Sequence, residues 1–370
     1  MKAVVTGQVG LNKKKFIRRV HEIALEMGMD FKIFNVGDMM YAEAPDVAKG
    51  KILDLPLVRL DNLRRSVFKD ILAEADRGCD LLVNTHATFR WNHGLFFAFD
   101  HDQMAMLDAD LYIVLVENID RVHYRLTRDG FAEHILKDLM VWREEEILTT
   151  ELLSRVMRGH GCFYICAQGD DSTAQTVARL MYCSREMKKA YLSFPMSHVA
   201  DQPEILREID EFRMMLKKCF ICFDPADIEE KQLCFMAADA ARAGRNFVEV
   251  GPYDEKARLD LHQLLDIIPD IDGQIYVRDF KLIDQSDMII SLVPELPGGK
   301  PAISSGVERE LQHAHESTRD VFVIWKPRRE PSPFITETAT KVFHSTQEAM
   351  GYFLQNGYIG HNDNPGPLFG

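Results

Sequence analysis

The sequence predicts an α/β protein built from two doubly wound parallel sheets in tandem. Short apolar runs alternate with amphipathic helical patterns over most of the 370 residues, which is typical of βαβ units. The alternation restarts as an independent series near residue 187, and a chain of this length is long enough for two domains. We therefore expect one domain at 1–186 and a second at 187–370.

The first domain alternates strand-like runs with helical patterns. The strand-like runs lie at 3–7, 31–38, 80–87, 109–118 and 161–168, and the helical patterns lie at 14–27, 63–78, 134–158 and 171–187. Phe16, Val20 and Ile23 recur on one face of the first helical pattern. Asp171 or Ser172 can cap the last one. This order indicates a parallel sheet with helices on both faces.

The second domain repeats this organisation. Its strand-like runs lie at 188–195, 219–225, 287–294 and 320–327, and its helical patterns lie at 203–218, 230–244 and 306–317. Pro203 stands near the first turn of a helix in which Ile205, Ile209 and Phe212 recur at helical spacing. The segment 357–370 has the composition of turns and is expected to be an extended tail.

Composition limits the classes of partner. A net charge of −13 disfavours broad binding to nucleic acid, but it allows a local basic pocket for a phosphorylated ligand. No apolar run approaches the ~20 residues of a membrane span, and no signal-peptide pattern precedes the first strand, so we expect a cytoplasmic protein. Seven cysteines lie scattered in apolar segments, and Cys219 and Cys222 lack a second CxxC pair. Reduced, buried thiols are therefore favoured over a zinc or redox site.

The first strand-like run ends in a loop with the rhythm of a phosphate-binding loop. Gly7 and Gly10 are followed by Asn12, Lys13 and Lys14, and a helical pattern begins at once. In such a loop the backbone N–H groups and the helix N-terminus face an anion, and the lysine spans the phosphates. We therefore expect a nucleotide to bind here.

Residues 1–185 resemble nucleoside monophosphate kinases, particularly the adenylate kinase type of archaea. The resemblance rests on "VVTGQVGLNKK", "VGDMMYAEA", "LLVNTHATFRWNHGLF", "LYIVLVENIDRVHYRLTRD" and "GCFYICAQGDDSTAQTVARLM", which occur in the family's order. It implies a P-loop kinase-like fold with ATP or another nucleotide on the loop and a monophosphate under "VGDMMYAEA". The implied nucleotide-binding residues are Gly7, Gly10, Asn12, Lys13, Lys14, Asp38, His86, Arg90, Arg125 and Arg128.

Two positions depart from that family. Lys14 stands where the family has the hydroxyl that holds Mg²⁺, and Asn84 stands where it usually has an aspartate. An ammonium group cannot bind a metal ion, and an amide is a poorer ligand for a hard cation than a carboxylate. We therefore expect nucleotide binding with weak or no kinase activity, and we leave the need for magnesium open. The alternatives are an active kinase and a scaffold without a ligand.

The second domain carries two carboxylates that could flank one bond. Glu308 lies in the first turn of a helical pattern that opens at Gly306, where the helix N-terminus favours a carboxylate. Asp279 is expected to begin a helix that ends before an apolar strand, and so to lie near the carboxyl edge of the sheet. Two carboxylates that flank one bond can cleave a glycosidic bond. The simpler interpretation is a dipole partner and a helix cap.

Residues 187–330 resemble nucleoside 2-deoxyribosyltransferases and their relatives that hydrolyse 2′-deoxynucleoside 5′-phosphates. The resemblance rests on "AYLSFPMS", on Asp279 eight residues before Asp287, on Gly306-Val307-Glu308, and on "VFVIWKP". It implies a Rossmann-like, flavodoxin-like sheet. It also implies that Glu308 is the nucleophile or the oxocarbenium stabiliser, that Asp279 transfers a proton and that Tyr191 orients the glutamate. The implied substrate-binding residues are Ser193, Pro195, Met196, Ser197, Asp287, Ser304, Ser305 and Gly306, with the serines as candidates for a 5′-phosphate.

Together these features predict an enzyme that cleaves or exchanges the N-glycosidic bond of a (deoxy)nucleoside or its 5′-monophosphate, with no cofactor or metal ion required for that step. The acceptor, water or a second base, stays open, as do the base and the sugar. The alternatives are a bifunctional kinase–glycosidase of nucleotide salvage and a nucleotide sensor without turnover, including one in stress or phage defence. The expected partners are nucleosides, nucleotides and further copies of the chain.

Overall fold

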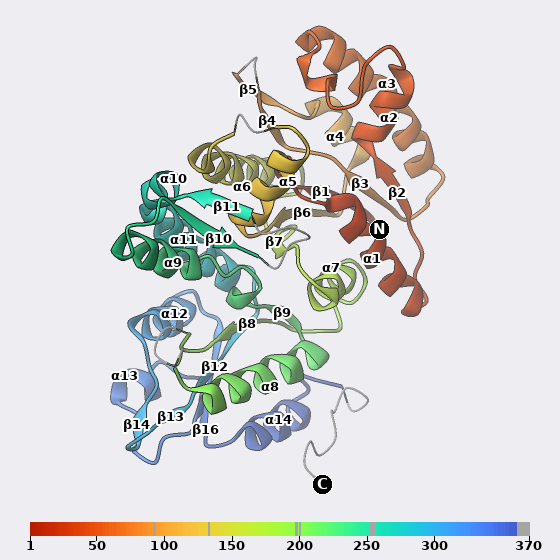
Figure 1. Cartoon of the computed structure of the whole chain (residues 1–370). Coiled ribbons are helices and arrows are strands. Elements are labelled where there is room, and N and C mark those ends of the chain that lie inside the picture. Colours follow the sequence, from red (N-terminus) through yellow and green to blue (C-terminus); the bar gives the residue numbers. More distant parts are fainter. Residues whose placement is uncertain (92–93, 132–133, 197–198, 200, 252–256, 361–370) are drawn as a thin grey trace. The chain divides into compact units, whose positions relative to one another are not determined.

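The chain divides into two compact units (Figure 1). The structure, a computed structural model, describes residues 1–360 except 92–93, 132–133, 197–198, 200 and 252–256. The first unit comprises 1–181 and 227–274, and the second comprises 182–226 and the chain from 275 onward. Each unit contains a five-stranded parallel sheet, which confirms the predicted fold class. Residues 227–274 pack with the first unit, although the predicted boundary at 186 groups them with the second.

The first sheet has the strand order β2-β3-β1-β6-β7. Its strands are β1 (Lys2–Thr6), β2 (Lys32–Asn35), β3 (Leu81–Asn84), β6 (Leu111–Val116) and β7 (Phe163–Ala167). β3 and β6 are buried along their whole length, as expected for a parallel sheet covered on both faces. β1 lies between them, with Val5 opposite Asn84 and Ile113. The carboxyl ends of these strands therefore meet at one edge, where ligands of open α/β sheets bind.

Helices pack against this sheet. They are α1 (Lys13–Glu26), α2 (Val36–Glu43), α3 (Leu57–Asp76), α4 (His101–Leu107), α5 (Ile119–Arg128), α6 (Leu136–Arg158) and α7 (Asp171–Tyr182), with a short 3₁₀ turn at Ile52–Asp54. A separate antiparallel pair is formed by β4 (Thr88–Trp91) and β5 (Gly94–Phe97). Phe16, Val20 and Ile23 are buried, which confirms the predicted inward face of α1. Val67 and Phe68 of α3 belong to the core on one side of the sheet.

Segment 227–274 completes the first unit. It follows a 3₁₀ turn at Pro225–Asp227 and contains α9 (Lys231–Arg242), β10 (Phe247–Val250), β11 (Ala257–Asp260) and α10 (Leu261–Asp266). β10 and β11 form an antiparallel pair, and α10 packs against α9 and α6. α11 (Ile268–Asp284) belongs to the first unit as far as Gln274 and to the second from Ile275.

The second sheet has the order β16-β15-β12-β8-β9, and all its pairings are parallel. Its strands are β8 (Lys189–Ser193), β9 (Ile221–Phe223), β12 (Met288–Val293), β15 (Asp320–Trp325) and β16 (Lys341–Phe343). The other elements are α8 (Pro203–Cys219), β13 (Glu295–Leu296), β14 (Lys300–Pro301), α12 (Ser305–Glu316), α13 (Pro333–Thr336) and α14 (Thr346–Gln355). Numbered within the unit, the order is flavodoxin-like, and its topological switch point lies between β8 and β12.

Because side chains alternate along β8, the two faces of the second sheet carry different kinds of residue. Ala190 and Leu192 belong to a core with Phe212 of α8 and Phe353 of α14. The alternate residues Tyr191 and Ser193 point to the other face, against which α12 packs. The apolar face of β8 therefore secures the fold, and its opposite face presents two hydroxyls.

Three further features of the structure concern membrane-spanning helices, cysteine thiols and possible metal ligands. Across the described residues, no helix is both long and apolar enough to cross a membrane. The seven cysteines are free thiols, and Cys219 and Cys222 are buried. No three His, Cys, Asp or Glu side chains within the described ranges are placed to hold a metal ion together.

Candidate functional site

The loop after β1 is folded around the side chain of Lys13. Gly7 and Gly10 have φ angles of 141° and 93°, and a Cβ atom on Gly7 would lie 2.8 Å from the carbonyl oxygen of Leu115. The Lys13 Nζ donates to the carbonyl oxygen of Gly7 at 3.0 Å and to that of Thr85. The predicted order of strand, glycine loop, lysine and helix is therefore present, with the lysine buried at the edge of the sheet.

Burial weakens the charges of this loop. It lowers the pKa of Lys13 to about 7, against the opposing effect of the Glu146 carboxylate. The Nδ1 of His86 lies 3.4 Å from the Lys13 Nζ, and burial together with the Lys13 charge lowers the pKa of His86 well below its ordinary value. A phosphate bound here would favour the protonated form of Lys13, so anion binding and protonation are linked.

Glu146 of α6 holds the loop in place, although it is not among the predicted residues. Its Oε1 accepts from the backbone N–H groups of Gly7 at 2.9 Å and Ala87 at 2.8 Å. Its Oε2 accepts from the backbone N–H and the hydroxyl of Thr88 at 2.8 and 2.9 Å. This buried carboxylate therefore ties the phosphate loop to the segment after β3. In the sequence it is the last of three consecutive glutamates in a charged helix, and this pattern does not distinguish a buried site residue from exposed charges.

The two positions that depart from the kinase pattern are occupied by other contacts. The Nζ of Lys14 forms an exposed ion pair with Asp38 of α2. The Nδ2 of Asn84 donates to the Oδ1 of Asn35 at 2.8 Å. The Oδ1 of Asn84 is buried without a hydrogen-bond partner in the described part of the chain. Neither position offers the hydroxyl or carboxylate that would support Mg²⁺ at this loop.

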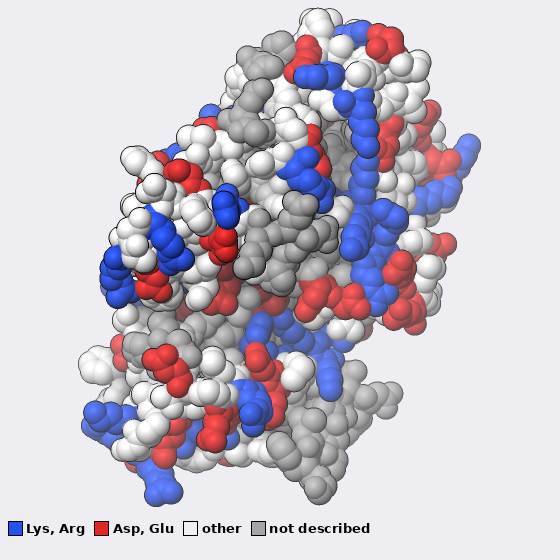
Figure 2. Space-filling view, viewed as in Figure 1, with Lys and Arg blue, Asp and Glu red and all other residues white. Residues whose placement is uncertain are grey.

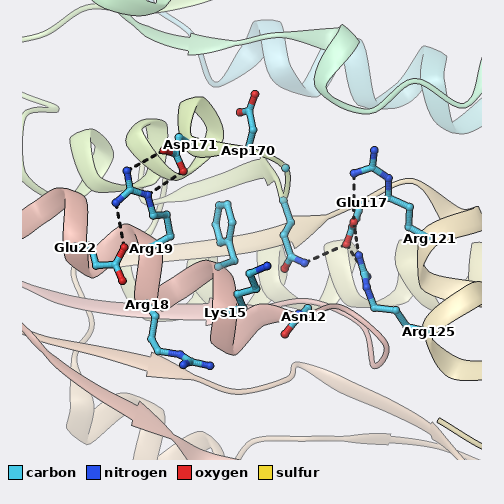
Figure 3. A pocket seen from close by; sticks show the side chains of 13 residues that line it. Asn12, Lys15, Arg18, Arg19, Glu22, Glu117, Arg121, Arg125, Asp170 and Asp171 are labelled. Atoms are coloured by element: carbon cyan, nitrogen blue, oxygen red, sulfur yellow. Dashed lines mark hydrogen bonds and ion pairs between the residues drawn. The ribbon is translucent and has the colours of Figure 1, made fainter. Parts of the chain in front are cut away.

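A pocket of about 480 Å³ lies beside the loop, between α1, α5 and the segments that follow β6 and β7 (Figure 3). Its lining residues are Asn12, Lys15, Phe16, Arg18, Arg19, Glu22, Glu117, Arg121, Arg125, Gln168, Gly169, Asp170 and Asp171. Basic side chains also gather on the surface over α1 (Figure 2). The pocket therefore offers basic groups beside a phosphate loop, as a nucleotide requires.

Glu117, directly after β6, organises the basic wall of this pocket. Arg125 donates to its two carboxylate oxygens at 2.8 and 2.5 Å and to the carbonyl oxygen of Gly10 at 3.0 Å. Gln168 donates to Glu117 at 3.0 Å, and the Arg121 guanidinium lies 3.8 Å away. Only Arg125 and Gly10 among these were predicted. Glu117 and Gln168 each follow a buried strand directly, and that position at the carboxyl edge is a signal that could have found them.

Two predicted arginines lie outside the lining of this pocket. Arg90, on β4, is paired through two nitrogens with Glu145 of α6, and its Nε lies 3.0 Å from Oε2. Arg128 is exposed at the end of α5 and donates to Asp129 at 3.0 Å. Asn12 does line the pocket, so the structure gathers only part of the predicted set.

In the second unit, the glutamate that faces Tyr191 is Glu310, not the predicted Glu308. The Tyr191 hydroxyl donates to the Oε1 of Glu310 at 2.9 Å, and the Ser193 hydroxyl donates to its Oε2 at 2.6 Å. Ser291 on β12 donates to the Ser193 hydroxyl at 3.3 Å. Glu308 is exposed on α12. The expected tyrosine–glutamate contact exists, but with a glutamate two residues later.

The phase of α12 explains this difference. The buried residues Val307, Leu311 and Ala314 define the inward face of the helix. Glu310 lies three residues after Val307 and four before Ala314, so it is next to that face. Glu308 shares its side of the helix with the exposed Gln312. Helical periodicity would therefore have favoured Glu310.

Asp279 supplies a second, partly buried carboxyl group. It lies inside α11 rather than at its start, because the helix begins at Ile268. Its Oδ1 is buried and lacks a hydrogen-bond partner among the described residues. Burial raises the pKa of Asp279 to about 6, against the charge of Arg278.

The charge of Asp279 affects the ionisation of Glu310. Burial raises the pKa of Glu310 to about 8, and the charge of Asp279 adds to this, while the hydrogen bonds from Ser193 and Tyr191 oppose it. Burial and these two carboxylates also raise the pKa of Tyr191 well above its usual range. Near neutral pH the two carboxyl groups therefore retain a proton between them.

The remaining predicted substrate residues are only partly brought together. Asp287 directly precedes β12, so it lies at the edge opposite Glu310, where it accepts from the backbone N–H of Lys189 at 2.8 Å. The Ser304 hydroxyl caps α12 by accepting from the N–H of Val307 at 3.2 Å. Ser305 and Gly306 are exposed, Pro195 is buried, Met196 packs against the core, and Ser197 lies outside the described residues.

Comparison with known proteins supports the identity of the first unit. The model of a protein family described as an AAA domain matches residues 7–135. Adenylate kinases of Pyrococcus abyssi, Pyrococcus horikoshii and Pyrococcus furiosus are each 27% identical over 157 residues, which cover 41% of this chain and 75% of theirs. The first unit is a nucleotide-binding, P-loop kinase-like domain with a distant similarity to archaeal adenylate kinases.

Proposed function

We propose that the second unit cleaves or exchanges the N-glycosidic bond of a (deoxy)nucleoside or its 5′-monophosphate. The observation that carries this proposal is the position of Glu310. It lies beside the switch point between β8 and β12, its two oxygens accept from Tyr191 and Ser193, and the carboxyl group of Asp279 is near enough to raise its pKa. One protonated and one ionised carboxyl group are what glycosidic bond cleavage requires.

Glu310 and Asp279 would have different roles in this reaction. The step requires the form of the pair in which its one proton lies on Asp279 and Glu310 is the carboxylate. The two hydroxyl groups that donate to Glu310 favour that form, and a carboxylate there suits an attack on C1′ of the sugar or the stabilisation of an oxocarbenium ion. As the bond from C1′ to the base breaks, its electron pair goes to the base nitrogen, and the proton on that nitrogen comes from Asp279. Water or a second base then replaces Glu310 at C1′ and returns a proton to Asp279.

For the first unit, we propose nucleotide binding with little or no magnesium-dependent phosphoryl transfer. The ion pair of Lys14 with Asp38 and the amide contact of Asn84 with Asn35 support this, because both stand where the metal ion would be held. The second candidate is a bifunctional kinase–glycosidase. The similarity to adenylate kinases and the intact Lys13 loop favour it.

The direct test is a panel of ribo- and deoxynucleosides and their 5′-monophosphates, with free base separated by chromatography. Base released into water indicates hydrolysis, and product that appears only with an added second base indicates exchange. No base from any substrate contradicts the proposal and favours a sensor. A parallel assay with Mg-ATP and each monophosphate tests the kinase, and turnover at ~1–100 s⁻¹ would contradict the expected weak transfer. Self-association of the chain stays a prediction.

A further inference from the structure

The helix that carries the pocket arginines is anchored by a residue from the inserted segment 227–274. α5 begins at Ile119 and carries Arg121 and Arg125. The backbone N–H of Ile119 donates to the Oε1 of Glu230 at 2.8 Å, across 111 residues of sequence. The preceding Asn118 makes no side-chain cap of its own. Glu230 therefore supplies the missing cap, and its negative charge also suits the positive end of the helix dipole.

Glu230 is itself held by Arg143 of α6. The two side chains form a pair of hydrogen bonds at 2.7 and 3.0 Å, and their side chains are 0% and 3% exposed. Arg143 also donates to the carbonyl oxygen of Glu117 at 3.3 Å and to Oε1 of Gln274 at 2.9 Å. Gln274 donates in turn to the carbonyl oxygen of Met140 at 3.0 Å. A buried ion pair persists when its remaining polar atoms are satisfied in this way.

These contacts converge on a short stretch of backbone, residues 117–119. Arg143 binds the carbonyl group at its start, and Glu230 binds the N–H group at its end. The same stretch presents the Glu117 side chain, which holds Arg125 against the phosphate loop. A shift of this backbone would therefore move both the carboxylate and the arginines that line the pocket.

We infer that Glu230, Arg143 and Gln274 are positioning residues for nucleotide binding, because they fix the backbone from which Glu117, Arg121 and Arg125 reach the pocket. The inference rests on nucleotide binding by the first unit and not on the chemistry of the second. It assigns segment 227–274, which lies in the chain between two strands of the second sheet, to the nucleotide site.

A second contact between α6 and the same segment provides a matched control. The Nζ of Lys137 lies 2.5 Å from the Oδ2 of Asp270, and both side chains are partly exposed. This ion pair joins the same two parts of the first unit, but within the described part of the chain it makes no contact with residues 117–119. Lys137→Met therefore tests whether docking of the segment alone explains an effect on the pocket.

The experiment measures the affinity of the full chain for ATP by titration calorimetry, with circular dichroism to check that each variant is folded. Glu230→Gln keeps the shape of the side chain and removes its charge, and we expect it to weaken ATP binding about tenfold. Gln274→Ala should weaken it by about two- to threefold, and Lys137→Met should leave it unchanged. Glu230→Ala would remove every hydrogen bond that Glu230 accepts from Arg143 and Ile119, whereas Glu230→Gln keeps an acceptor oxygen at that position, so Glu230→Gln is the working variant.

A double-mutant cycle separates positioning from general stability. If Glu230 acts through the arginine helix, Glu230→Gln should weaken ATP binding by less than about twofold when Arg125→Ala is already present. An unchanged affinity in Glu230→Gln, an equal loss in Lys137→Met, or a full tenfold loss in the Arg125→Ala background would each overturn the inference. Failure of the unmodified chain to bind ATP would overturn nucleotide binding by this pocket as well, so the two failures are distinguishable.

Discussion

The two sheets place an ionisable base and an ionisable acid at the same kind of edge. At the carboxyl edge of the first sheet the buried group is Lys13, which donates to the carbonyl oxygens of Gly7 and Thr85. At the carboxyl edge of the second it is Glu310, which accepts from Tyr191 and Ser193. Burial shifts both toward neutrality, and the pKa values become about 7 for Lys13 and about 8 for Glu310.

This comparison separates what the fold supplies from what the side chains supply. Each parallel sheet brings the ends of several strands to one edge and so creates a place for a ligand. The sign of the buried charge then selects the ligand: an ammonium group suits the phosphates of a nucleotide, and a carboxylate suits the positive charge that develops on a sugar as its glycosidic bond breaks.

The largest effect is expected on base release, when Glu310 at the carboxyl edge of the second sheet is replaced. Glu310→Gln is expected to lower the rate of base release on the order of 10³-fold or more, because an amide cannot become the carboxylate that meets C1′. Glu308→Gln, on the exposed side of the same helix, should change the rate by less than about twofold, as surface substitutions usually do. Chromatography of the released base measures both. A strong loss in Glu308→Gln with an active Glu310→Gln would return the role to Glu308.

The next largest effect is expected on ATP binding, when Lys13 at the carboxyl edge of the first sheet is replaced. Lys13→Met should weaken ATP binding by about ten- to a hundredfold, because a charge-assisted contact with phosphate is lost. Lys14→Met is the matched control, since Lys14 is exposed and paired with Asp38. It should weaken binding by no more than about threefold, the worth of a surface ion pair. Titration calorimetry gives both affinities, and equal losses would show that Lys14 contacts the phosphates.

The lowered pKa of Lys13 also predicts that ATP binding is accompanied by proton uptake. At pH 8 most of the free protein has a neutral Lys13, because its pKa is about 7. Bound phosphate favours the charged form, so ATP binding at this pH should take up between about half a proton and one proton. Calorimetry in buffers with different ionisation enthalpies measures the uptake. It should disappear in Lys13→Met, and uptake that persists there but disappears in His86→Asn would identify His86 as the group that titrates.

Local motifs were predictable from the sequence, whereas residues that act over long separations were not. Gly7, Gly10 and Lys13 lie within seven residues of one another and directly follow a strand, so the loop could be identified. Glu146 lies 139 residues from the Gly7 N–H that it accepts from, and Glu230 lies 111 residues from Ile119. Nothing in the local pattern marks these contacts, because they depend on how α6 and the inserted segment pack.

Two residues of the second unit lie elsewhere than predicted for a different reason, because the sequence held the information about their positions. Glu308 was chosen for its place in the first helical turn, although the phase of Val307, Leu311 and Ala314 favours Glu310. Asp287 directly precedes its strand, and a residue there lies at the amino edge of a parallel sheet, away from the site. Both positions follow from elementary geometry once the strand and helix bounds are known.

The smallest expected effect is on stability, and it depends on pH. The folded pKa of Glu310 is about 8, above the model-compound value of 4.5. Between these values the unfolded chain loses this proton while the folded chain keeps it, so the free energy of unfolding falls as the pH rises and the loss is complete above about pH 8. Glu310→Gln removes this penalty. Its melting temperature, relative to the unmodified chain, should therefore rise by about 3–6 °C between pH 5 and pH 8.5.

Scanning calorimetry at the two pH values checks this, with Glu308→Gln as the control because its side chain is exposed. The melting temperature of Glu308→Gln should differ from that of the unmodified chain by the same small amount at both pH values. A relative melting temperature of Glu310→Gln that does not change with pH would mean that Glu310 is ionised in the folded chain throughout this range. Its burial would then be offset by Tyr191 and Ser193 alone, and the second edge would hold a fixed negative charge instead of a shared proton.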